Sequence, residues 1–269
     1  MNLAKLTTKK GLNNITTTCK NCDYSFEGNF CNNCGQTANT HDINFHEILH
    51  EIQHSILHID KGILFTTKEL FKRPGNSIRE YIFGKRVKHF KPFAYILLLS
   101  TIYALLSKFS DKTTDIDQMI LGYNNGSNTV LKGKEDLIVD VLHWMQQHYA
   151  YTTLLLIPII SLASYLSFFK TKYNYFQHLI LNTFIAGQKT AIFLLMLPIV
   201  YFIKDNDLND SIDTFKVYLG IFLTFLTYYQ FFDSTKPVKR IFLTVLTYIV
   251  MVILIFVIVL IFGILIKLI

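Results

Sequence analysis

Apolar residues gather in long runs that begin at Pro92, whereas the first ninety residues are mostly polar. A helix needs about 20 consecutive apolar residues to cross the hydrocarbon core of a bilayer. Five stretches come near this length, at residues 92–109, 149–169, 179–203, 215–232 and 241–266. The last of them contains no charged residue. The pattern predicts a mainly α-helical fold with a five-span transmembrane bundle at residues 92–269.

The charged residues between these stretches alternate in sign along the chain. The segment before the first span, KRPGNSIREYIFGKRVKHFK, is strongly basic, and the loops at 170–172 and 236–240 are basic too. The loops at 111–140 and 205–213 are acidic. Lysine and arginine in short loops stay on the cytoplasmic side of a membrane. We therefore expect a cytoplasmic N-terminus and an external C-terminus.

Composition and charge support a membrane protein. Only 17% of the residues are charged, against about 25% in soluble domains. The net charge of +7 is placed in the loops near the predicted membrane surface, so we expect no nucleic-acid partner. The first eighteen residues lack the apolar stretch of a cleavable signal peptide, and we expect residues 1–18 to be a disordered tail.

All four cysteines lie in the segment CKNCDYSFEGNFCNNC, as Cys19, Cys22, Cys31 and Cys34. Two C-x2-C pairs supply four thiolates with the spacing of a structural zinc site, and four thiolates leave no open coordination position. The segment is too short for a hydrophobic core, so metal binding would drive its folding. We predict a zinc ribbon at residues 19–36 that stabilises the chain or binds a protein partner. The alternatives are a rubredoxin-type iron site, or two disulfides if the orientation were reversed.

The segment HEILHEIQH contains the pattern His-Glu-x-x-His twice, as zinc metalloproteases do. On a helix, one apolar side is formed by Phe45, Ile48, Leu49, Ile52, Ile56, Ile59 and Ile63. The opposite side carries Glu47 and Glu51 and the histidines His46, His50, His54 and His58. We interpret this as an amphipathic helix with a solvated histidine face. A membrane metalloprotease, metal binding by spaced histidines and pH sensing are the alternatives.

Residues 40–91 are predicted to form amphipathic and basic helices next to the membrane. Pro74-Gly75 indicates a turn, Asn76 or Ser77 a helix cap, and Gly84 a helix end. Basic residues that could contact anionic lipid headgroups are Arg73, Arg79, Lys85, Arg86 and Lys88. These charges could equally serve only to set the membrane orientation.

Polar residues inside the third predicted span are candidates for function. Lys189 is the one charge well inside a span, and Gln188 and Asn182 lie near it. Ionisable residues within a membrane commonly mark a transport pathway. Lys189 could instead extend to the cytoplasmic surface, so a functional and an anchoring role stay open.

The motifs CKNC…CNNCGQ and RPGNSIREYIFGKR, followed by Lys91-Pro92-Phe93, resemble a family of bacterial multi-pass membrane proteins known only as a domain of unknown function. The resemblance implies a bacterial inner-membrane location, but no reaction, substrate or catalytic residue. We expect a non-enzymatic scaffold, regulator or assembly factor. A small transporter or channel using the Lys189 region is the main alternative, and the metalloprotease is a third.

Overall fold

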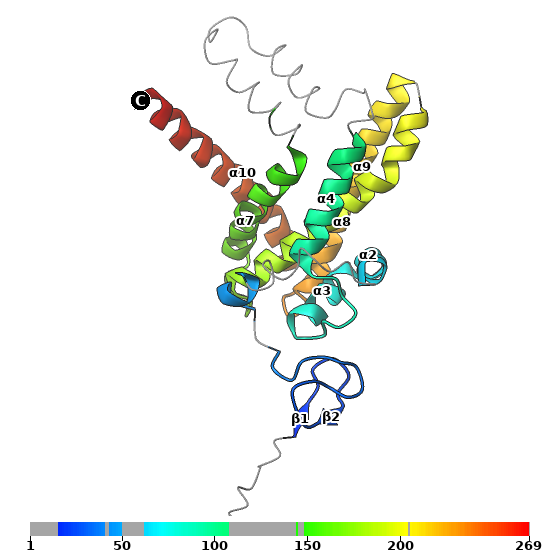
Figure 1. The fold of residues 1–269 in the computed structure, drawn as a ribbon. Helices are drawn as coiled ribbons and strands as arrows, with labels where there is room; N and C mark the ends of the chain where they lie inside the picture. The colour runs from blue at the N-terminus through cyan, green and yellow to red at the C-terminus, as the bar shows by residue number, and fades with distance from the viewer. Residues whose placement is uncertain are drawn as a thin grey trace, which may run out of the picture.

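The structure is a computed structural model that describes residues 16–40, 43–49, 62–107, 144, 148–203 and 205–268 (Figure 1). Two short strands precede the named helices. The elements are β1 (Thr17–Thr18), β2 (Ser25–Phe26), α2 (Gly62–Lys72), α3 (Pro74–Ile82), α4 (Pro92–Ser107), α7 (Tyr149–Ser167), α8 (Tyr175–Phe202), α9 (Asn206–Phe231) and α10 (Pro237–Leu268). Residues 45–49 are also helical.

Helices α4, α7, α8, α9 and α10 form a bundle in which successive helices run in opposite directions (Figure 1). Helix α8 lies at its centre and contacts α4, α7 and α9, while α10 packs on α7 and α9. Helices α4, α8 and α10 begin at the end of the bundle nearest to β1 and β2, and α7 and α9 finish there. We call this end the ribbon end.

Three of the described helices are long and apolar enough to cross a membrane. The qualifying stretches are Ala150–Ser167, Tyr175–Phe202 and Pro237–Ile258. Helix α4 has 16 described residues, and the first half of α9 carries charged residues such as Asp213 and Lys216, which pair with each other. The mainly helical fold is therefore confirmed, three of its described helices could span a membrane, and the number of five spans stays a prediction.

A buried hydrogen-bond network joins α7, α8 and α9 near the ribbon end. The Ser164 hydroxyl lies 2.9 Å from Nδ1 of His178, and the Asn182 amide donates to it at 3.0 Å. The Tyr228 hydroxyl donates to Oδ1 of Asn182 at 2.7 Å. Hydrogen bonds between membrane helices contribute about 0.6 kcal/mol each, so the network sets the packing of the three helices more than it stabilises them.

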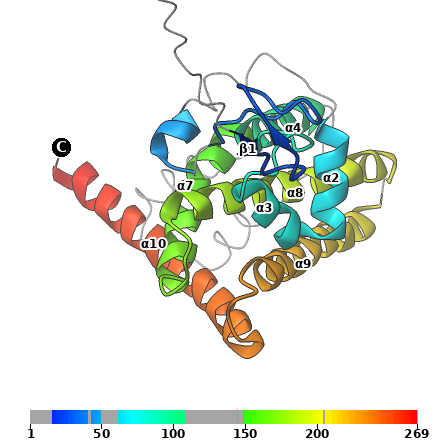
Figure 2. The same cartoon turned by 90° about the horizontal axis from the view of Figure 1, so that it is seen from below.

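Helices α2 and α3 lie across the ribbon end, as the view from below shows (Figure 2). Helix α3 begins at Pro74, so the predicted turn at Pro74-Gly75 and the predicted cap at Asn76 or Ser77 are wrong. Proline fits the first turn of a helix because its missing N–H would have no partner there. Gly84 ends this segment as predicted, with a φ of +108°.

Gly75 allows α3 to approach the backbone of α9. A Cβ atom at this position would lie 2.3 Å from the carbonyl oxygen of Thr227 and 2.4 Å from the backbone nitrogen of Phe231. The Gly75 N–H donates to the side-chain oxygen of Gln230 at 3.1 Å. No side chain can be accommodated here unless one of the two helices moves.

We expect Gly75→Ala to separate α3 from α9 and to destabilise the ribbon end by about 1–3 kcal/mol, the usual cost of overpacking. Gly220→Ala is the matched control, because a Cβ at Gly220 would meet its nearest neighbour, the Lys189 side chain, at 3.7 Å. Thermal unfolding and limited proteolysis in detergent would compare the two variants. Equal stability of both would contradict the close contact.

Candidate metal centre

The four cysteines come together in a small ribbon, which we define as residues 16–40. Strands β1 and β2 form an antiparallel hairpin, in which Thr17 pairs with Phe26 and Thr18 with Ser25. The hairpin brings Cys19 and Cys22 back against the second cysteine pair, Cys31 and Cys34. All four sulfur atoms lie within 4.8 Å of one another.

The sulfur positions suit a tetrahedral metal ion. The Sγ atoms of Cys19 and Cys34 are 3.5 Å apart, and those of Cys22 and Cys31 are 3.6 Å apart. Zn–S bonds of about 2.3 Å in a tetrahedron separate the sulfurs by about 3.8 Å. All four cysteines are free thiols, since a disulfide needs a sulfur separation of about 2.05 Å. The cluster can bind a metal ion.

The two cysteine pairs are held by the same backbone turn. The N–H of Cys19 donates to Tyr24 O, and that of Asp23 donates to Cys19 O. At the corresponding places of the second pair, Cys31 N–H donates to Gln36 O and Gly35 N–H to Cys31 O. The residue after each second cysteine has a positive φ, 58° at Asp23 and 78° at Gly35. This repeat gives each pair the same orientation toward the centre.

The two thiols of the first cysteine pair differ in how readily they form the thiolate needed for metal binding, because burial raises the pKa of Cys19 to about 11. The hydrogen bond from the backbone N–H of Tyr24 lowers the pKa of Cys22 to about 7. The backbone N–H of Asn21, 3.4 Å from Sγ of Cys19, offsets the effect of burial on Cys19 only in part. Backbone N–H groups stabilise the negative charge on sulfur, so part of the ligand set is prepared before a metal arrives.

Gln36 fastens the ribbon to the segment after α3. Its side-chain nitrogen donates to Gly84 O at 2.8 Å, and its side-chain oxygen accepts from the Arg86 N–H at 3.3 Å. The Gln36 side chain is buried, so both of its ends are satisfied by this one loop. Within the ribbon, Lys20 donates a hydrogen bond to Thr40 O at 2.8 Å. The ribbon is therefore docked on the α3–α4 connection.

Three of the five basic residues predicted at a membrane surface are held in ion pairs. Arg73 pairs with Glu69 and, through two hydrogen bonds of 2.7 and 3.1 Å, with Glu80. These hydrogen bonds lower the pKa of Glu80. Because the pairs hold α2, α3 and their flanks together, Arg73 has a structural role that the sequence prediction did not include.

Two further arginines tie α3 to distant parts of the chain. Arg79 pairs with Asp233 in the α9–α10 connection, and Arg86 pairs with Glu47 at 3.3 Å. The side chains of Lys85 and Lys88 are exposed. Among the five basic residues, the two lysines thus remain the ones that present charge to the surroundings.

The predicted histidine face lies mostly outside the described residues, since His50, Glu51, His54 and His58 are not among them. His46 is exposed, and Glu47, the first candidate general base, is engaged by Arg86. Within the described part of the chain, the four cysteines form the one cluster of three or more metal-ligating side chains.

The polar residues predicted within the third span join helices in the structure. The Gln188 side chain donates to Leu70 O near the end of α2 at 2.6 Å, and Asn182 belongs to the buried network described above. Lys189 is partly buried beside Gly220 of α9. The sequence pattern did not identify Ser164, His178 and Tyr228 as partners of Asn182. The spacing of His178 and Asn182, four residues apart on one helical face, was the available signal.

Residues 60–104 match a protein family described as a protein of unknown function (DUF3667). The matched range includes α2, α3 and most of α4, and therefore the segment RPGNSIREYIFGKR. Neither the curated proteins nor the solved structures gave a match. The match supports the resemblance to an uncharacterised family for this part of the chain, and the ribbon lies outside it.

Asp23 and Gly35 occupy equivalent positions in the turns of the two cysteine pairs, and this equivalence predicts which substitutions of Gly35 the ribbon tolerates. A Cβ at Gly35 meets nothing within 4 Å, so only the positive φ limits substitution. Gly35→Asp should retain metal affinity, because Asp23 already adopts this conformation, whereas Gly35→Val should cost about 1–2 kcal/mol or more. Competition with a chromophoric zinc chelator would measure both variants. Equal loss of affinity in both would contradict the role assigned to the backbone.

Proposed function

We propose that this protein is a five-span protein of the bacterial inner membrane with a cytoplasmic N-terminus and an external C-terminus. The alternating directions of α4, α7, α8, α9 and α10 support this orientation. The basic residues of the α7–α8 and α9–α10 connections lie at the ribbon end, together with the ribbon itself. Charge placement of this kind is typical of the cytoplasmic side.

The ion we propose for the four-cysteine cluster is zinc in a structural role. A set of four thiolates at this spacing suits Zn²⁺, and it leaves no coordination position for water or substrate. Zinc supplies folding free energy in such sites rather than chemistry. The ribbon would therefore be folded when loaded with metal and unfolded without it.

We infer that the protein is a membrane scaffold or regulator whose ribbon receives a protein partner. The observation that carries this proposal is the double hydrogen bond of Gln36 with Gly84 and Arg86, which couples the ribbon to α3 and through α3 to the bundle. The ribbon exposes Tyr24 and Phe30, with 49% and 60% of their surface accessible. Exposed aromatic residues on a rigid support are suited to protein contacts.

A test of this function places a photo-cross-linking amino acid at Phe30 in the membrane of living cells. We expect a discrete protein adduct that disappears in the Cys31→Ser background, because loss of metal unfolds the ribbon. Lys189→Met should leave the adduct unchanged. Immunoblotting after irradiation would measure the amount of adduct in the otherwise unchanged protein, the Cys31→Ser variant and the Lys189→Met variant.

Reporter fusions after Ile269 and near Lys172 would establish the membrane orientation in the same cells. We expect the first reporter on the external side and the second on the cytoplasmic side.

In the cross-linking experiment, an adduct that survives Cys31→Ser, or the lack of any adduct at Phe30, would contradict the proposal that the ribbon receives a protein partner. Dependence of the cellular function on Lys189 with an unaffected ribbon would favour the transporter instead.

A further inference from the structure

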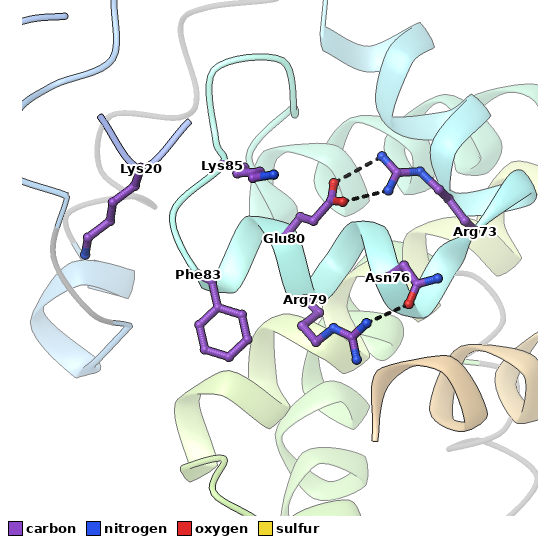
Figure 3. Close-up of a pocket in the computed structure, with 7 residues that line it drawn as sticks. All are labelled: Lys20, Arg73, Asn76, Arg79, Glu80, Phe83 and Lys85. Atoms are coloured by element: carbon purple, nitrogen blue, oxygen red, sulfur yellow. Dashed lines mark hydrogen bonds and ion pairs between the residues drawn. The ribbon is translucent and has the colours of Figure 1, made fainter. Parts of the chain in front are cut away.

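A pocket of about 400 Å³ opens between the ribbon and α3 (Figure 3). Lys20 of the ribbon forms one side, and the remaining lining residues, between Arg73 and Lys85, come from α3 and its flanks. Sites for small molecules have volumes of roughly 300–1,000 Å³. The pocket is thus large enough for a phosphate group with a small organic part.

The charged groups of the pocket are two arginines held in ion pairs, the carboxylate of Glu80, and two lysines, of which Lys85 lies near enough to Glu80 to help lower its pKa. Arg73 and Arg79 are held by Glu80 and Asp233, respectively, together with their other partners. Among the described residues, Lys20 and Lys85 have no carboxylate within ion-pair distance, and the Lys20 ammonium donates one hydrogen bond, to a backbone carbonyl. Figure 3 shows the Lys20 ammonium directed away from Lys85, so a ligand bound by both lysines requires Lys20 to turn toward the pocket.

We propose that this pocket binds a phosphate-bearing ligand between Lys20 and Lys85. Both lysines supply point charges suited to phosphate oxygens, and the guanidinium groups of Arg73 and Arg79 are held by their ion pairs. Phe83, half-exposed, provides an apolar wall for the organic part of the ligand. The Lys172 ammonium lies 4.9 Å from the centre of the Phe83 ring and adds positive charge beside that wall.

Two sources could provide the phosphate. The pocket lies beside the α9–α10 connection, because Arg79 of its lining pairs with Asp233 there. If the proposed membrane orientation holds, this level faces the headgroups of the inner leaflet, so a phospholipid can present its phosphate. A soluble phosphorylated compound can reach the pocket whatever the orientation. Only the lipid source rests on the proposed function.

The ligand would connect the ribbon with α3. Lys20 directly follows Cys19, so its position depends on the fold of the metal-bound ribbon, whereas Lys85 follows the Gly84 carbonyl to which Gln36 is bonded. A phosphate bound by both lysines adds a third link between the two parts. Metal loading and ligand binding should therefore strengthen each other.

The test uses the full-length, zinc-loaded protein and two probes. Calorimetric titration with inorganic phosphate, after delipidation, measures the soluble source. Native mass spectrometry with phosphatidylglycerol, compared with phosphatidylcholine, measures the lipid source. We expect saturable binding in one arm, and the double variant Lys20→Gln, Lys85→Gln should weaken it on the order of tenfold or more, as expected when two charge-assisted hydrogen bonds are lost.

The matched control is Lys68→Gln, Lys91→Gln, which removes the same charge from exposed lysines outside the pocket. It should change the affinity by less than about twofold, as screened surface charges do. Zinc content verifies that each variant keeps its ribbon. Binding in neither arm, or equal weakening by both double variants, would overturn the pocket. In that case, a cross-link at Phe30 that still depends on Cys31 would continue to support the proposed scaffold function.

Discussion

The backbone contact between α3 and α9 at Gly75 is the constraint on which the ribbon end of the molecule depends. Helix α9 belongs to the bundle, and α3 can lie on it only because Gly75 has no side chain to meet Thr227 and Phe231. Arg79, one turn further along the same face of α3, pairs with Asp233 just beyond α9. With α3 held in this way, the segment that follows it becomes a fixed support for the ribbon.

The charged residues around α3 illustrate how one segment can serve several parts of the fold. Arg73, Arg79 and Arg86 each reach a carboxylate from a different region: Glu69 of α2, Asp233 of the α9–α10 connection and Glu47 of the N-terminal segment. Exposed ion pairs are usually worth less than about 1 kcal/mol each. Their contribution is therefore mainly to orientation, because together they fix α3 relative to three neighbouring segments.

The sequence was informative where the chemistry is local and silent where partners are distant. The spacing of Cys19, Cys22, Cys31 and Cys34 predicted a cluster that the structure brings together, since the ligands lie within one short segment. Long apolar runs predicted helices able to cross a membrane, because length and composition decide this. The predicted turn at Pro74-Gly75 failed because the same two residues also suit the first turn of a helix.

Long-range pairs could not be deduced from the pattern of residues. Nothing in the order of the chain assigns Gln36 to Gly84 and Arg86, or Gln188 to the carbonyl of Leu70. The partners of these side-chain amides are determined by tertiary packing, which places a backbone N–H or C=O group without another partner close to the amide. Polar side chains in apolar helices show that a partner is needed, but not which residue provides it.

The coupling of the metal-bound ribbon to the bundle through Gln36 gives the ribbon end its proposed role. Hydrogen exchange of the protein in lipid nanodiscs, with and without a zinc chelator, tests this coupling most directly. Removing the metal should speed exchange of the Arg86 amide by about fivefold, the equivalent of one hydrogen bond worth about 1 kcal/mol, while the amides of α9 near Thr227 stay protected. Unchanged exchange at Arg86 after the ribbon has lost its metal would contradict the coupling.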